Sequence, residues 1–172
     1  HSSSACIPAD ARGEVQMLAK EAGVLAGSTI AREVMQTIDP GLEWELLIEE
    51  GSRIQPGDVI MTISGNKRSI LQAERLILNF MQRMSGIATQ TAVYADKIAD
   101  LKTQVLDTRK TTPGLRIFEK HAVLAGGGQN HRMGLYDMIM LKDNHIDFAG
   151  GIRQAIEKTQ AYLKNTGKKI PV

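Results

Sequence analysis

The chain has few of the features that would assign it at once to a particular class. Cys6 is the only cysteine, which excludes an intramolecular disulfide and favours a reducing compartment. No apolar run approaches the roughly 20 residues that cross a bilayer. The net charge is only +2, well below the basic excess of a chain that binds nucleic acid. These observations predict a cytoplasmic protein that binds neither nucleic acid nor a membrane.

The amino terminus also lacks the marks of a targeting segment. The chain opens with His1-Ser-Ser-Ser instead of methionine, and no basic stretch is followed by an apolar one, so no signal peptide is predicted. We expect that residues upstream of His1 have been lost. What the chain does have is apolar composition, 42% of its 172 residues, which is ample for a folded core.

The first third is predicted to be a small α+β unit. Short apolar pieces at 23–27, 46–48 and 59–63 are broken by Gly and Pro and predict strands. A helix is predicted over 31–38. Gln55-Pro-Gly-Asp58 has Pro and Gly where a tight turn needs them, so we expect it to join two antiparallel strands.

A change to helical periodicity follows. Between 70 and 99 there is no proline and apolar residues recur three or four apart, which predicts one long helix or two helices meeting near Ser85-Gly86. We place the domain boundary here, with an N-terminal α+β domain over 1–78 and a second domain over 79–172.

The second domain shows the pattern of a parallel α/β fold. Strands are predicted at 104–106, 138–141 and 169–172, with helices over 113–125 and 148–163 between them. Thr112 and Asp147 are the expected N-caps, and Gly126 and Gly167 follow the helix ends. Three parallel strands cannot close a barrel, which usually needs about 250 residues. Either the sheet is open or the chain is cut.

Polar clusters follow two of these strands, where parallel α/β folds place their chemistry. Residues 107–114 follow the first strand and 142–145 the second, and 126–133 lead into the second. We expect the cationic side chains of these segments to converge on one cavity, with His131 beside them: Arg109, Lys110, Arg132 and Lys142. Arg and Lys so arranged suit a ligand with several anionic groups.

Simpler interpretations remain open for each feature. Gly126-Gly-Gly128 could approach a phosphate or only end a helix, and Thr108 could only cap one. Arg109-Lys110 alone could be a solvated surface pair, although the position of both clusters at strand ends favours a site. The histidines show no zinc-ligand spacing, so no protein-held metal is predicted.

The sequence resembles the quinolinate phosphoribosyltransferase family in long motifs over nearly its whole length. The matching stretches are Ala73-Glu-Arg75, Leu78-Asn-Phe80, Gln82-Arg-Met-Ser-Gly-Ile-Ala-Thr89, Asp107-Thr-Arg-Lys-Thr-Thr-Pro-Gly-Leu-Arg116, Gly126-Gly-Gly-Gln-Asn-His-Arg132 and Lys142-Asp-Asn-His-Ile146. The resemblance implies an α/β fold, with an α/β sandwich-like N-terminal domain followed by the first strands and helices of a parallel α/β barrel. It also implies a homodimer, or an assembly of dimers, with shared active sites.

The activity that the resemblance implies is that of a pentosyltransferase of NAD biosynthesis. It joins quinolinate to phosphoribosyl pyrophosphate and releases pyrophosphate and CO₂ to give nicotinate mononucleotide, with Mg²⁺ held mainly by phosphoribosyl pyrophosphate.

Residue roles follow from the resemblance as well. Arg109, His131, Arg132 and Lys142 would surround the quinolinate carboxylates, with Thr108 nearby. Lys110 would face phosphoribosyl pyrophosphate, and Arg75 would reach into the partner subunit's site. Lys110 and Lys142 are the expected catalytic residues.

The sequence departs from the family pattern in places, and two other functions stay open. His121 stands where many members have Tyr, and the acidic residue before His1, the acidic strand and the Gly-rich phosphate turn of the later barrel are missing, so the chain resembles a fragment that stops within the barrel. A related pyrophosphorylase with a different acceptor is the nearest alternative. A lipoyl or biotinyl carrier module is the remote one, because residues 50–60 resemble its hairpin but carry no Lys at the turn.

Overall fold

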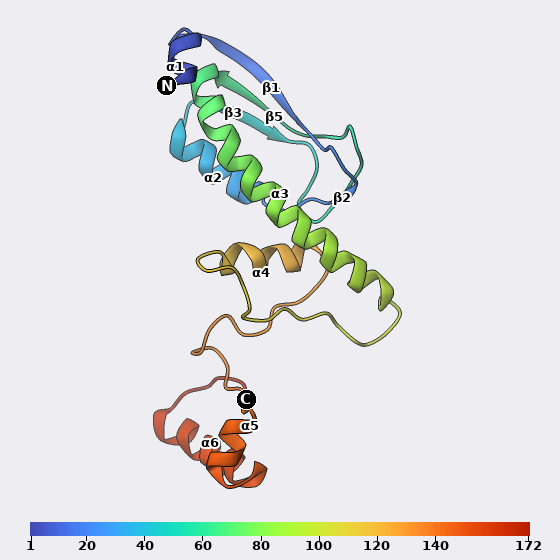
Figure 1. Ribbon diagram of the computed structural model, residues 1–172, viewed down its shortest axis with the longest axis vertical. Coiled ribbons are helices and arrows are strands. Elements are labelled where there is room, and N and C mark those ends of the chain that lie inside the picture. The colour runs from blue at the N-terminus through green and yellow to red at the C-terminus, as the bar shows by residue number, and fades with distance from the viewer. The chain divides into compact units, whose positions relative to one another are not determined.

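The computed structural model describes all of residues 1–172, which divide into two compact units. The first unit comprises 1–107 with 111–130, and the second comprises 108–110 with 131–172. Figure 1 shows the elements in chain order. The first unit holds α1 (Ser2–Cys6), β1 (Arg12–Leu18), β2 (Gly23–Val24), α2 (Ser28–Ile38), β3 (Glu43–Leu46), β4 (Arg53–Ile54), β5 (Val59–Asn66), α3 (Lys67–Lys97) and α4 (Arg116–Ala125). The second holds α5 (Asp143–Ala149) and α6 (Ile152–Thr166).

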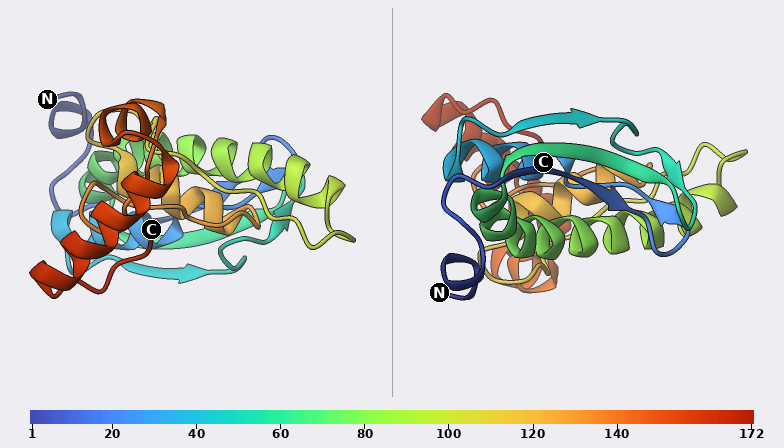
Figure 2. Two further views of the ribbon diagram at one scale, coloured as in Figure 1. Left: turned by 90° about the horizontal axis from the view of Figure 1, so that it is seen from below. Right: turned by 90° about the horizontal axis from the view of Figure 1, so that it is seen from above.

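The first unit is built on an antiparallel sheet of order β1-β5-β3, and β2 pairs separately with β4. Met61 and Ile63 on the central strand β5 are buried, and they join a core with Ala31 and Met35 of α2 and Ile77 of α3. The two helices lie against the sheet, as Figures 1 and 2 show. The mixed α/β character predicted from the sequence is confirmed.

The turn over 55–58 forms, but not as the predicted hairpin. The Asp58 amide donates to the Gln55 carbonyl at 3.1 Å, and Gly57 has a φ of +94°, a conformation that suits glycine. The strands on either side pair with different partners, β4 with β2 and β5 with β1 and β3. The prediction of two paired strands is therefore wrong, since pairing is decided by distant segments that a local pattern does not reveal. The hairpin of a carrier module is likewise absent.

Helix α3 links two cores. Asn66 caps its N-terminus, because its Oδ1 accepts from the amides of Arg68 at 2.9 Å and Ser69 at 3.3 Å. The helix continues without a break through Ser85-Gly86, so the prediction of one long helix is confirmed and the alternative of two is wrong. Its second half packs on α4 (Figure 1), where Ala88 and Ala122 are completely buried. The predicted domain boundary near residue 78 lies within this helix and stays a prediction.

Two helix starts differ from the prediction. Helix α4 begins at Arg116 after Leu115, and Thr112 is not its N-cap, because the Thr112 hydroxyl accepts from Arg83 instead. The helix predicted over 148–163 is two helices, α5 and α6, separated by Gly150 and Gly151. Asp147 therefore lies inside α5 and caps nothing. The predicted ends at Gly126 and Gly167 are confirmed as C-caps.

The three strands predicted after residue 100 do not form as regular strands. Leu106 makes one isolated parallel bridge, to Gln129 and not to the segment 138–141. The Ile139 amide donates to the Pro171 carbonyl at 2.8 Å. A strand requires a continuous ladder of partner hydrogen bonds, and single bonds of this kind do not make one. No helix of the structure has both the length and the apolar composition to cross a membrane.

Candidate active site

The second unit contains a pocket of about 350 Å³ in which three of the predicted site residues meet. It is lined by Arg109, Arg132, Leu135, Met138, Ile139, Met140, Lys142 and His145. Three of the predicted residues, Arg109, Arg132 and Lys142, are therefore brought together from separate segments of the chain. No carboxylate lines this pocket.

The segment between Arg132 and Met138 is held by a carboxylate. Asp137 accepts from the amide of Met133 at 2.6 Å and from the amide of Gly134 at 2.8 Å, one bond to each oxygen. Such charge-assisted bonds are among the stronger ones in proteins. They close a turn over 133–137, which lies between Arg132 and Met138 in the chain. The Arg132 guanidinium lies 3.6 Å from the Met140 sulfur.

Lys142 and His145 are linked at the start of α5. Lys142 has extended backbone as the N-cap residue, and its amide donates to Nδ1 of His145 at 3.0 Å. Nδ1 is the acceptor of this bond, which orients the imidazole ring at the start of the helix. His145 lines the pocket and was not predicted as a site residue. Its place in the Lys142-Asp-Asn-His145 cluster was the signal that could have identified it.

The remaining predicted residues have different surroundings. Thr108 is exposed, and its hydroxyl accepts from the Lys110 amide at 3.1 Å, which fixes the turn that carries Arg109. Lys110 is exposed and is not among the pocket residues. His131 is partly buried and immediately precedes Arg132. Arg75 lies exposed on α3 in the first unit.

A cluster at the start of α4 lowers the pKa of Glu119. Burial of this side chain would by itself raise the pKa, but hydrogen bonds from Arg83 and Thr112, with the charge of Arg83, hold it below its ordinary value. The Thr112 amide donates to Oε2 at 3.1 Å, and Arg83 pairs with Oε1. Glu119 is thus an ionised anchor for the residues that follow Lys110.

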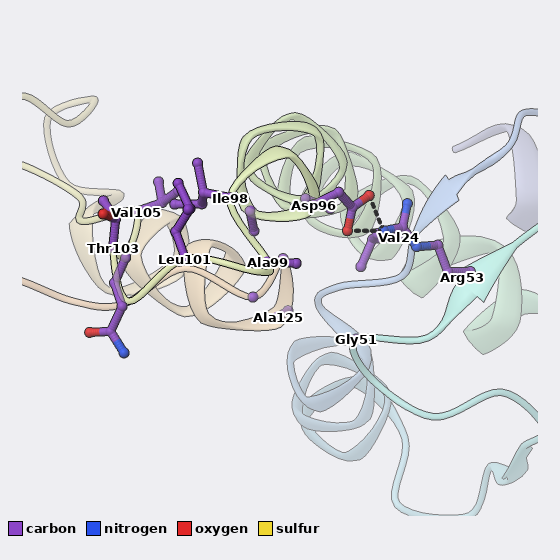
Figure 3. A pocket seen from close by; sticks show the side chains of 15 residues that line it. Val24, Gly51, Arg53, Asp96, Ile98, Ala99, Leu101, Thr103, Val105 and Ala125 are labelled. Carbon is purple, nitrogen blue, oxygen red and sulfur yellow. Dashed lines mark hydrogen bonds and ion pairs between the residues drawn. The ribbon is translucent and has the colours of Figure 1, made fainter.

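The first unit has a cavity of its own, of about 420 Å³, with a different character (Figure 3). Its walls are mainly Ala, Gly and other apolar residues between the end of α3, the segment 98–105 and the end of α4. Arg53 is its one cation, and Nη2 pairs with Asp96 at 2.7 Å and 2.5 Å, the contact drawn in Figure 3. Because this charge is already balanced, the cavity is a poorer anion site than the pocket of Arg109 and Arg132.

The chain matches two family models that together span nearly all of it. Residues 2–85 match the N-terminal domain of quinolinate phosphoribosyl transferase, and residues 87–172 match the C-terminal domain.

Curated relatives and a solved structure are similar over most of the chain. Quinolinate phosphoribosyltransferase [decarboxylating] 1b of Nicotiana tabacum is 49% identical over 98% of this chain and 47% of its own length. The chloroplastic nicotinate-nucleotide pyrophosphorylase [carboxylating] of Arabidopsis thaliana is 48% identical over 98% of this chain and 48% of its own length. The crystal structure of NadC from Streptococcus pyogenes has a TM-score of 0.90 at 45% identity, covering 94% of this chain and 57% of that one.

These matches agree with the family that the order of motifs along the sequence suggested. The chain spans about half the length of the curated relatives it matches. It belongs to the quinolinate phosphoribosyltransferase family.

Proposed function

We propose that the protein containing this chain transfers a phosphoribosyl group from phosphoribosyl pyrophosphate to quinolinate, with decarboxylation, and so acts as a pentosyltransferase of NAD biosynthesis. The observation that carries the proposal is the pocket formed by three cations, Arg109, Arg132 and Lys142, with no carboxylate among its lining residues. The names of the relatives support it, since they specify this acceptor and this decarboxylation.

The three cations and the apolar wall of the pocket support quinolinate as the acceptor. It is a flat ring with two adjacent carboxylates, and Arg can bind a carboxylate through two parallel hydrogen bonds while Lys acts as a point charge. The apolar wall of Leu135, Met138 and Met140 can pack against the ring. His131, next to Arg132 in the chain, and Thr108, next to Arg109, complete the proposed acceptor site.

The proposed reaction needs positioning and charge more than proton transfer. The ring nitrogen forms a bond to C1 of the ribose, the bond from that carbon to pyrophosphate breaks, and pyrophosphate leaves with the electron pair. The ring nitrogen then carries a positive charge. The bond between the neighbouring ring carbon and its carboxylate can therefore break, with its electrons drawn into the ring. CO₂ leaves and a proton takes its place. Cations fixed in advance, Lys110 and Lys142 among them, would stabilise the departing negative charge.

In this proposal Mg²⁺ is bound by the substrate and not by side chains of the protein. The pocket side chains are cationic, apolar or imidazole, whereas Mg²⁺ prefers oxygen ligands. No group of three or more His, Cys, Asp or Glu side chains in the chain is arranged to hold a metal ion. The residues present therefore do not fit a protein-held Mg²⁺, and phosphoribosyl pyrophosphate would supply its oxygens.

The assembly and the location are further parts of the proposal. Arg75, exposed on α3, is the residue we expect to reach a partner subunit's site in a homodimer. Sedimentation equilibrium tests this, because a protein that stays monomeric at assay concentrations while fully active would contradict it. A cytoplasmic location stays a prediction, since relatives include forms named chloroplastic and mitochondrial.

Calorimetric titration tests the acceptor site. We expect the purified protein to bind quinolinate, and Arg132→Ala to weaken binding by about 2–5 kcal/mol, the range for removing one partner of a desolvated ion pair. Arg53→Ala is the matched control, because Arg53 is a cation lining the cavity in the first unit, and it should leave binding unchanged.

Nicotinate, which has one carboxylate, distinguishes the proposed function from its nearest alternative. Binding of nicotinate as tight as that of quinolinate would favour a pyrophosphorylase with a different acceptor. Equal effects of Arg132→Ala and Arg53→Ala would remove the pocket of the second unit from the binding site.

A further inference from the structure

Lys120 of α4 is a buried cation outside the pocket. Its side chain is 1% exposed, which is unusual for lysine, and its ammonium donates to Oδ1 of Asp107, whose side chain is 6% exposed. Both charges are thus removed from water in the interior of the first unit. A buried ion pair of this kind is often no more stabilising than well-packed apolar residues. Its presence here calls for another reason.

The other oxygen of Asp107 extends the pair into a network. With its amide oriented to satisfy the hydrogen bonds around it, Asn130 donates to Oδ2 of Asp107 at 2.6 Å and to the carbonyl of Lys120 at 2.9 Å. The backbone supports the same junction, because the Asp107 amide donates to the Gln129 carbonyl at 3.1 Å and the Gln129 amide donates to the Val105 carbonyl at 2.8 Å. The Lys120 ammonium therefore holds Asp107 directly and Asn130 through Asp107, while the Lys120 backbone carbonyl also accepts from Asn130.

The residues after these two anchors are the proposed site residues. Asp107 directly precedes Thr108-Arg109-Lys110, and Asn130 directly precedes His131-Arg132. Consecutive Cα atoms are about 3.8 Å apart, so fixing residue 107 and residue 130 fixes where each site segment starts. Both arginines of the proposed acceptor site lie within two residues of the network.

We propose that Lys120 is a positioning residue for the phosphoribosyl transfer: its buried ammonium holds Asp107, and through Asp107 also Asn130, and so fixes the starts of the two segments that carry Arg109 and Arg132. Lys120 does not line the pocket and touches no substrate in this scheme. The inference rests on the proposed function for its catalytic consequence. The network of Lys120, Asp107 and Asn130 itself lies wholly within the first unit.

The informative variant is Lys120→Met with Asp107→Asn. Lys120→Met alone leaves the Asp107 carboxylate buried without its ammonium, which can prevent folding, whereas the double variant removes both charges and preserves volume. We expect the double variant to fold and to lose roughly 10- to 100-fold in kcat/KM for quinolinate, because small displacements of binding groups cost rates of this size. Met35→Ala is the control, since Met35 is buried in α2 far along the chain from both anchors. It should lose stability and keep its kinetics per folded molecule.

Hydrogen exchange measures how firmly the network of Lys120, Asp107 and Asn130 holds the two segments, without reference to activity. In the double variant the amides of 105–110 and 129–132 should exchange faster, while those of α2 keep their protection. Wild-type kinetics per folded molecule, or unchanged exchange in these two segments, would overturn the proposal. If the wild-type protein neither binds quinolinate nor turns it over, the proposed function fails, and the exchange data still decide whether Lys120 holds the two segments.

Discussion

Arg109, Arg132 and Lys142 are separated along the sequence and meet in one pocket of the second unit. We predicted their meeting from apolar segments interpreted as parallel strands, and it holds although those segments form no regular strands. The part of His145 was not predicted, since it depends on a bond from the Lys142 amide to Nδ1 that no spacing rule reveals. The role of Arg75 stays a prediction, because an exposed arginine on a helix looks the same in the sequence whether it serves a site or only solvent.

Lys110 should act on a different substrate from Arg132. It is exposed and absent from the pocket of Arg109 and Arg132, which agrees with a partner other than quinolinate. We expect Lys110→Ala to raise KM for phosphoribosyl pyrophosphate more than KM for quinolinate, with an effect of about 1.5–3 kcal/mol for a charged hydrogen bond. Initial rates measured while each substrate is varied in turn give both constants. An equal rise in the two would refute the division of roles.

Among the elements, local patterns predicted helices and their ends better than strands. The helix α3 and the glycine ends of α4 and α6 follow from periodicity and from capping chemistry within a few residues. The paired glycines Gly150-Gly151, both with positive φ, separate α5 from α6 within the range predicted as one helix. Strand pairing at β4 and at Leu106 depends on distant partners, so the sequence pattern could not supply it.

The start of α4 should make stability depend on pH through Glu119. Its pKa is lowered in the folded protein, so its contribution is fully present above the unfolded value of about 4.3. The contribution is lost as the pH falls through the lower folded value. Urea unfolding at pH 7 and at successively lower pH should show a loss of stability in the wild type that is smaller in Glu119→Gln. Asp39, whose pKa is also lowered by its hydrogen bonds from Ser69 and Gly41, is present in both proteins and cancels in the comparison. Identical pH dependence in the two would contradict the anchor role of Glu119.

At the scale of the whole molecule, the buried network and the cationic pocket lie in different units. The first unit contains the network of Lys120, Asp107 and Asn130, and the second unit contains the cationic pocket. The proposed reaction requires an acceptor, a phosphoribosyl donor and release of CO₂. The chain spans about half the length of the curated relatives it matches, so turnover has to be measured on the protein that contains it.

The most direct measurement follows both products of one reaction. Quinolinate labelled with ¹⁴C in the carboxylate next to the ring nitrogen is incubated with phosphoribosyl pyrophosphate, Mg²⁺ and the purified protein, and released CO₂ and nicotinate mononucleotide are quantified together. The account predicts that the two appear in equal amounts, only when phosphoribosyl pyrophosphate is present, and that Arg132→Ala lowers both alike. Nucleotide formed from another acceptor with no CO₂ from quinolinate, or no product in either channel from a folded protein, would contradict it.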